Sequence, residues 1–160
     1  MTPLRSLALA LVLAALAAPV SAQTPFGLGD LGGDWQGSGT FARGAEEPGR
    51  IRCKIEFSTT ARGTTLVAGR CASSEGSDVF GLEVTEGEGG AISAMNRSEP
   101  PGSLPAELTG VLGADGMRLQ GEGIAALELR RDGQELTLAI VSGVADRPGR
   151  MDVRLARIAP

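Results

Sequence analysis

Short runs in which apolar and polar residues alternate cover most of the chain after residue 33. The clearest run spans residues 50–58, where every second residue from Ile51 to Phe57 is apolar and the residues between them are charged or polar. Alternation with a period of two places the apolar side chains on one face of a β-strand. The same pattern recurs over residues 78–86, 136–140 and 151–155, and weaker runs cover residues 34–43, 64–72, 91–96, 106–112, 117–122 and 124–131.

Turn sequences that contain glycine separate many of these runs. They occupy residues 61–63, 86–90, 114–116 and 132–133. Asp132-Gly133 between two alternating runs is the strongest hairpin signal in the chain. Residues 97–105 contain three prolines and predict the longest loop. No window has a sustained helical period, and the 24 glycines disfavour long helices.

These nine or ten runs, joined mostly by tight turns, predict an all-β fold. A single flat sheet of this size would expose its edges and one apolar face. Closure into an up-and-down antiparallel β-barrel of about eight to ten strands removes the edges, and consecutive hairpins favour it over a Greek key. A β-sandwich is the alternative. The charged outward faces and the absence of tyrosine argue against a barrel embedded in a membrane.

The only two cysteines, Cys53 and Cys71, are expected to form a disulfide. If they face each other on adjacent strands, Thr60 pairs with Thr64 across a three-residue loop that ends in Gly63. Such a loop is favoured in β-hairpins, with glycine where a positive φ is needed. The turn sequence and the disulfide therefore predict the same register.

The N-terminus has the organisation of a secretory signal peptide. Arg5 supplies a positive charge, residues 7–18 contain only Leu, Ala and Val, and small residues at Val20 and Ala22 precede an expected cleavage before Gln23. A dozen apolar residues are too few to cross a bilayer, which needs about 20. We expect an exported protein that is periplasmic or extracellular, where disulfides persist.

Cleavage after residue 22 leaves a chain whose length fits one domain. We expect residues 23–32 to form a flexible N-terminal segment and residues 33–160 to form a single barrel domain. Without Arg5, 14 basic residues remain against 19 acidic ones, a net charge of -5. This acidic balance argues against nucleic acid or anionic lipid as a partner.

Histidine is absent, which excludes serine–histidine catalysis, histidine metal ligation and histidine-bound haem. The carboxylates fall in turns or on outward faces, and nothing places two of them across a cleft, as a two-carboxylate glycosidase requires. Gly37-Ser38-Gly39 lacks the lysine and the following helix of a phosphate-binding loop. We therefore expect a protein that is not an enzyme and binds no metal or cofactor.

The most specific feature is the first strand, in which Trp35, Gly37, Gly39 and Phe41 share one face. Glycine at these positions permits strong coiling of the strand or leaves volume unfilled. Three further glycines, Gly69, Gly110 and Gly121, also fall on faces expected to point inward. Two interpretations follow, a tightly curved barrel packed to its centre or a barrel with a narrow apolar cavity.

A Gly-x-Trp sequence at Gly33-Asp34-Trp35 resembles the start of lipocalins and other calycin-like barrels, in which the tryptophan closes one end of the barrel. This opening, together with Arg52-Cys53-Lys54 and Gly69-Arg70-Cys71-Ala72, resembles a family of small exported bacterial proteins of undefined function. The resemblance covers residues 33–72. Because the chain has no histidine, we do not expect it to bind haem as nitrobindin-like relatives do.

The leading hypothesis is a non-enzymatic exported barrel that binds a small apolar ligand, with its interior lined by Trp35, Phe41, Phe57 and Phe80. The alternative is a protein-interaction module, such as a periplasmic protease inhibitor or an envelope-associated factor. Small disulfide-bonded bacterial barrels that resemble this chain include inhibitors that act through an N-terminal segment, which here would be residues 23–32. The oligomeric state stays open.

Overall fold

The structure, a computed structural model, describes residues 26–100 and 102–159, so the expected signal peptide lies outside the described residues. The strands are β1 Gly33–Arg43, β2 Gly49–Thr59, β3 Thr65–Ser73, β4 Gly76–Glu86, β5 Ala91–Asn96, β6 Glu107–Leu112, β7 Gly116–Gly121, β8 Ala126–Asp132, β9 Glu135–Val144 and β10 Arg147–Arg157. Two short 3-10 helices accompany them, η1 Leu28–Leu31 and η2 Glu88–Gly90.

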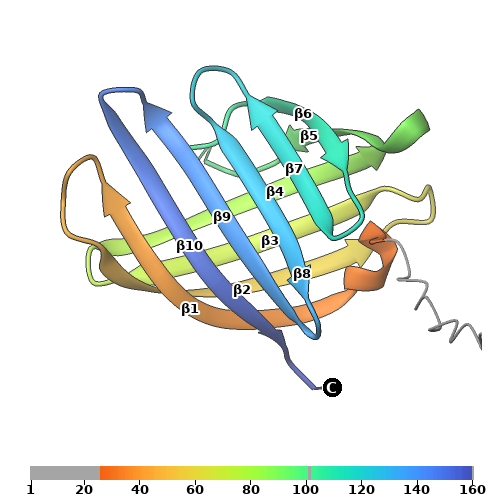
Figure 1. The fold of residues 1–160 in the computed structure, drawn as a ribbon, viewed down its shortest axis with the longest axis horizontal. Helices are drawn as coiled ribbons and strands as arrows, with labels where there is room; N and C mark the ends of the chain where they lie inside the picture. Colours follow the sequence, from red (N-terminus) through yellow and green to blue (C-terminus); the bar gives the residue numbers. More distant parts are fainter. Residues whose placement is uncertain (1–25, 101, 160) are drawn as a thin grey trace, which may run out of the picture.

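The ten strands form a closed up-and-down barrel, which confirms the predicted fold (Figure 1). Each strand pairs antiparallel with the strand before it, and β1 pairs with β10 to complete the circle. The chain therefore builds a barrel and not the alternative sandwich. Because every strand has two neighbours, no strand in the barrel is left as an open edge.

The predicted register of the first cysteine-containing hairpin is also confirmed. Cys53 pairs with Cys71 on β2 and β3, their Cα atoms lie 4.1 Å apart, and the two sulfurs are bonded. The backbone N–H of Thr60 donates to the carbonyl of Thr64 at 2.8 Å, and Gly63 has a φ of 79°. The turn and the disulfide thus select the same pairing of β2 with β3.

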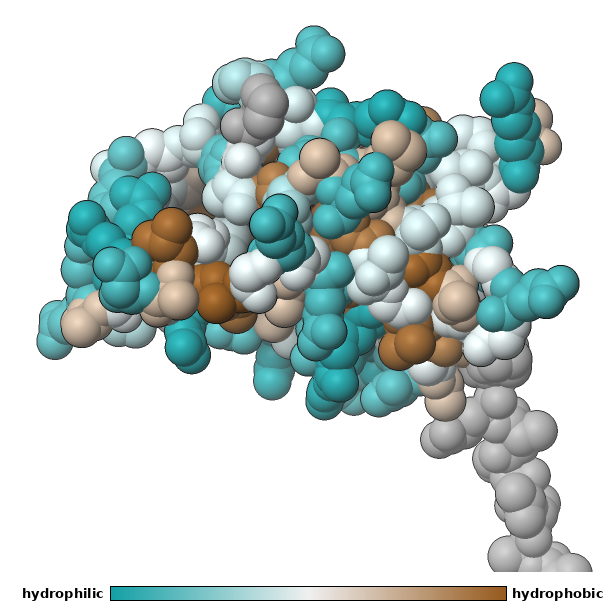
Figure 2. Space-filling view, turned by 90° about the horizontal axis from the view of Figure 1, so that it is seen from above, coloured by the Kyte–Doolittle hydropathy of each residue, from teal (hydrophilic) through white to brown (hydrophobic). Residues whose placement is uncertain are grey.

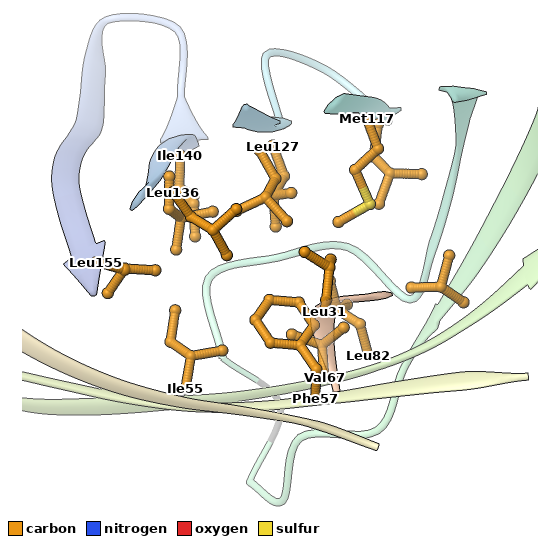
Figure 3. Packing of buried hydrophobic residues seen from close by; sticks show 14 of the residues in the cluster. Leu31, Ile55, Phe57, Val67, Leu82, Met117, Leu127, Leu136, Ile140 and Leu155 are labelled. Carbon is orange, nitrogen blue, oxygen red and sulfur yellow. The ribbon is translucent and has the colours of Figure 1, made fainter. Parts of the chain in front are cut away.

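Alternation along the strands directs one set of apolar side chains into the barrel. Ile55, Phe57 and Val67, from β2 and β3, point toward residues from β7 to β9 on the opposite wall (Figure 3). Outward faces are mainly polar, and Figure 2 shows one side of the molecule, on which hydrophilic side chains surround smaller apolar areas. No helix in the described ranges is long and apolar enough to cross a membrane.

At the five inward glycines named above, backbone or ring atoms of neighbouring residues fill the space that a side chain would take. A Cβ added at Gly37 or Gly39 would overlap the carbonyl oxygens of Arg154 or Asp152 on β10. A Cβ at Gly110 would likewise overlap the β7 backbone, one at Gly69 the ring of Phe80, and one at Gly121 the ring of Pro105. Of the two interpretations, tight curvature is therefore the right one at these five glycines.

Of the segment 23–32, which we expected to be flexible, the structure describes residues 26–32, and their apolar side chains are packed. Phe26, Leu28 and Leu31 are buried, with Leu28 and Leu31 only 1% and 0% exposed. The N–H of Phe26 donates to the carbonyl of Ala114 in the β6–β7 turn at 3.2 Å. Burial of three large apolar side chains is strongly favourable, so this segment packs across one end of the barrel.

Candidate functional site: a cavity at the open end of the barrel

The two ends of the barrel are closed to different degrees. At the end where β1 begins, η1 lies across the opening, and Leu31 lies among residues of both walls (Figure 3). Trp35 is 3% exposed, and its indole N–H donates to the Leu31 carbonyl at 2.8 Å. The Arg157 guanidinium covers the outer face of this tryptophan. The interior at this end is therefore filled by side chains of η1 and β1.

The opposite end, where β1, β3 and β9 finish, contains a cavity of about 380 Å³. Its inner wall is apolar and comes from strands on both sides of the barrel, with Phe41, Ile51, Phe80, Ile140 and Met151 as its largest side chains. Cys71 of the disulfide also reaches this wall. Polar and charged side chains at the end of the barrel, among them Arg43, Glu75 and Asp78, border the cavity.

The four aromatic residues expected to line one interior fall into two groups. Phe41 and Phe80 line the cavity, whereas Trp35 and Phe57 are buried away from it. Trp35 and Phe41 share a face of β1 but are six residues apart, which is about 20 Å along a strand. The alternation in the sequence indicates which residues face the interior. Which of these residues border open space depends on which end of the barrel η1 fills.

Ion pairs hold the rim of the cavity. Arg43, at the end of β1, lies 3.7 Å from Glu75 in the β3–β4 turn, and its guanidinium lies 5.3 Å from the ring centre of Phe41. Arg147 pairs with Glu46 at 2.6 Å and ties the β9–β10 turn to the β1–β2 loop. These exposed pairs each contribute little to stability, but they restrict the positions of the loops around the opening.

The proline-rich loop after β5 forms another part of the wall. The side-chain amide of Asn96 donates to the Leu104 carbonyl at 2.8 Å, and its oxygen accepts the backbone N–H of Ser98 at 2.9 Å. Ser98 in turn accepts the backbone N–H of Gly81 through its hydroxyl oxygen. The buried side chain of Leu104 thereby reaches the cavity. In the sequence, Leu104 is an apolar residue within an otherwise polar loop, and this could have indicated that it is buried.

Ser142 on β9 is the polar residue of the wall that sequence reasoning missed. It is 7% exposed, and apart from Thr65 it is the only buried polar side chain in the described residues. It continues the inward series of Leu136, Leu138 and Ile140, so its position on the inner face follows from the alternation. In the sequence, the position of Ser142 at the end of this apolar series could have indicated a polar group on the inner wall.

The lining of the cavity combines eight apolar side chains with eight polar or charged ones, the latter being Arg43, Ser73, Glu75, Ser77, Asp78, Ser98, Ser103 and Ser142. The acidic residues of the rim, Glu75 and Asp78, are exposed, and Glu75 is engaged by Arg43. Comparison of this chain with the known protein families and with curated proteins finds no match in either.

Proposed function

We propose that this protein is an exported, non-enzymatic β-barrel that binds a small apolar molecule in the cavity at its open end. The observation that carries the proposal is the difference between the two ends. One end is filled by η1 and Trp35, whereas the other keeps about 380 Å³ of space between an apolar inner wall and a polar rim. Ligand pockets are commonly about 300–1,000 Å³ and mostly apolar with a few polar groups.

The apolar inner wall favours apolar ligands, because moving apolar surface out of water is favourable. Phe41, Ile51 and Met151 offer aromatic, branched and flexible surfaces against which a ring or a short chain can pack. The position of Trp35 at the closed end supports a calycin-like relationship, in which the tryptophan closes one end of the barrel. We include that relationship in the proposal.

Export follows from the signal peptide expected over residues 1–22, and we propose a periplasmic or extracellular location. The disulfide between Cys53 and Cys71 is compatible with an oxidising compartment. Within the interaction-module alternative, the protease-inhibitor version depended on a free arm over residues 23–32. Residues 26–32 include the buried plug of Phe26, Leu28 and Leu31, so that part of the segment supports ligand binding by the barrel instead.

The test is binding of N-phenyl-1-naphthylamine, a neutral apolar probe whose emission rises in apolar surroundings, to the exported, purified protein. Ile140→Trp, which places a large side chain in the cavity, should weaken binding at least about tenfold while the protein still unfolds cooperatively. The matched control is Val111→Trp, since Val111 is 58% exposed on the outside of the barrel. Met151→Trp provides a second blocking variant.

Saturable binding that both blocking variants abolish and the control retains would support the proposal. No binding by the wild-type protein, or equal binding by all variants, would refute it, because the cavity would then not be where the probe resides.

A further inference from the structure

The hydroxyl of Ser142 lies in the cavity wall without a hydrogen-bond partner among the described residues. No side-chain nitrogen or oxygen in the described ranges is both fully buried and unpaired, so the Ser142 oxygen keeps access to solvent in the cavity. Ser142 is more than nine-tenths buried, so bulk water reaches it only through the cavity. Its unused donor and acceptor capacity is therefore directed at whatever occupies that space.

Gly149 keeps the hydroxyl accessible. It pairs directly with Ser142 across β9 and β10, and a Cβ at this glycine would lie 3.4 Å from Ser142 Oγ and 3.6 Å from the Phe41 ring. Any side chain here would occupy the space beside the hydroxyl. The glycine thus leaves a polar spot bordered by an aromatic ring, at the boundary between the apolar wall and the rim.

The charges around the cavity disfavour an anionic ligand group. The charged residues that line it are Arg43, Glu75 and Asp78, a net charge of -1. Arg43 is the single cation of this set, and Glu75 and the ring of Phe41 already engage it. A carboxylate entering this site would meet a net negative charge, since Glu75 and Asp78 outnumber Arg43, and like charges at short range repel.

We propose that the cavity selects a neutral amphiphile, with an apolar ring or chain against Phe41, Phe80 and Met151 and one uncharged oxygen-bearing group hydrogen-bonded to Ser142 Oγ. Alcohols, esters and ketones meet this description, whereas free fatty acids do not. A serine hydroxyl can donate to a carbonyl or accept from an alcohol, so it serves this whole class. This inference rests on the proposed function, because it names the ligand class of the same cavity.

Three probes of one shape test the inference at pH 7: naphthalene, neutral 2-naphthol and anionic 2-naphthoate. Wild-type protein should bind 2-naphthol at least about tenfold more tightly than 2-naphthoate. Ser142→Ala should weaken 2-naphthol about fivefold, the effect of losing one neutral hydrogen bond, and change naphthalene less than about twofold. Ser142→Thr, which keeps the hydroxyl, should restore 2-naphthol binding. Ser93→Ala, an exposed serine on β5, is the matched control.

The outcomes separate this inference from the proposed function. If none of the three probes binds, the cavity is not a ligand site and the proposed function fails with it. If naphthalene binds but Ser142→Ala leaves 2-naphthol unchanged, or weakens both ligands equally, the binding function stands and the role of Ser142 is wrong. Tighter binding of 2-naphthoate than of 2-naphthol would overturn the selection for neutral ligands.

Discussion

The guanidinium of Arg157 lies 4.9 Å from the ring centre of Trp35 and covers this residue at the closed end of the barrel. Its two terminal nitrogens each donate at 2.8 Å, one to the carbonyl of Gly32 and the other to that of Asp30. One side chain near the C-terminus thus holds η1 in place and shields the only tryptophan. The plug, the first strand and the last strand are thereby joined into one packed unit.

Arg157→Gln should lower the free energy of unfolding by about 1–2 kcal/mol, because it removes a cation–π contact and two hydrogen bonds that hold the plug. Urea unfolding followed by Trp35 fluorescence measures the change directly, and the native emission should shift to longer wavelength as the indole becomes more exposed. Arg154→Gln is the control, since Arg154 lies on the outer face of the same strand without an ion pair in the described residues. Equal effects of the two variants would contradict the role assigned to Arg157.

Gly39→Ala should destabilise the protein by about 3 kcal/mol or more, or prevent folding, because its Cβ would overlap the carbonyl oxygen of Asp152. The backbone of β10 would have to move away, which weakens the pairing that closes the barrel. Thermal unfolding by circular dichroism provides the measurement. Gly29→Ala is the control, because nothing lies within 4 Å of a Cβ at that position. A stable Gly39→Ala variant would show that the barrel does not turn so tightly at β1.

Removal of the disulfide by a Cys53→Ala/Cys71→Ala double substitution should cost about 3 kcal/mol, because the loop of 18 residues is no longer closed in the unfolded chain. Reducing agent should lower the unfolding midpoint of the wild-type protein and leave that of the double variant unchanged. Peptide mapping without reduction should recover the fragments around residues 53 and 71 joined together. Two free thiols in the exported protein would contradict the prediction.

Glu128 on β8 should contribute a small stabilisation that depends on pH. Partial burial alone would raise its pKa, but hydrogen bonds from Arg118, at 3.1 Å, and from Arg130, with their positive charges, outweigh this effect and lower the pKa. Since the folded-state pKa lies below the unfolded one, the stabilisation is present above the unfolded pKa. It is lost as the pH falls through the folded pKa.

The free-energy difference between wild type and Glu128→Gln should therefore be about 0.5–1 kcal/mol at pH 7 and vanish in strong acid. Urea unfolding at a series of pH values gives this difference. Glu86→Gln, at the exposed end of β4, is the control and should show no such trend. A difference that grows toward low pH would reverse the assigned direction of the pKa shift.

The strands, their inward faces and the pairing of Cys53 with Cys71 could be predicted from the sequence alone. All of these depend on local information: alternation defines which side chains share a face, and Gly63 defines the turn that sets the register. The inward positions of Phe41, Phe80 and Ser142 follow from the same rule. Sequence reasoning could therefore indicate which residues face the interior, but not which of them border a cavity.

Which parts of the interior are filled could not be predicted without the folded barrel. Whether η1 packs into one end depends on the apolar surface that ten strands assemble together, and no local pattern around Leu28 and Leu31 reveals that surface. The same holds for Gly37 and Gly39, since a glycine on an inward face leaves a void or admits a neighbouring backbone according to the curvature of the whole barrel. Curvature and plugging are properties of the closed sheet, and they place the cavity at the end where Phe41, Phe80 and Ser142 meet.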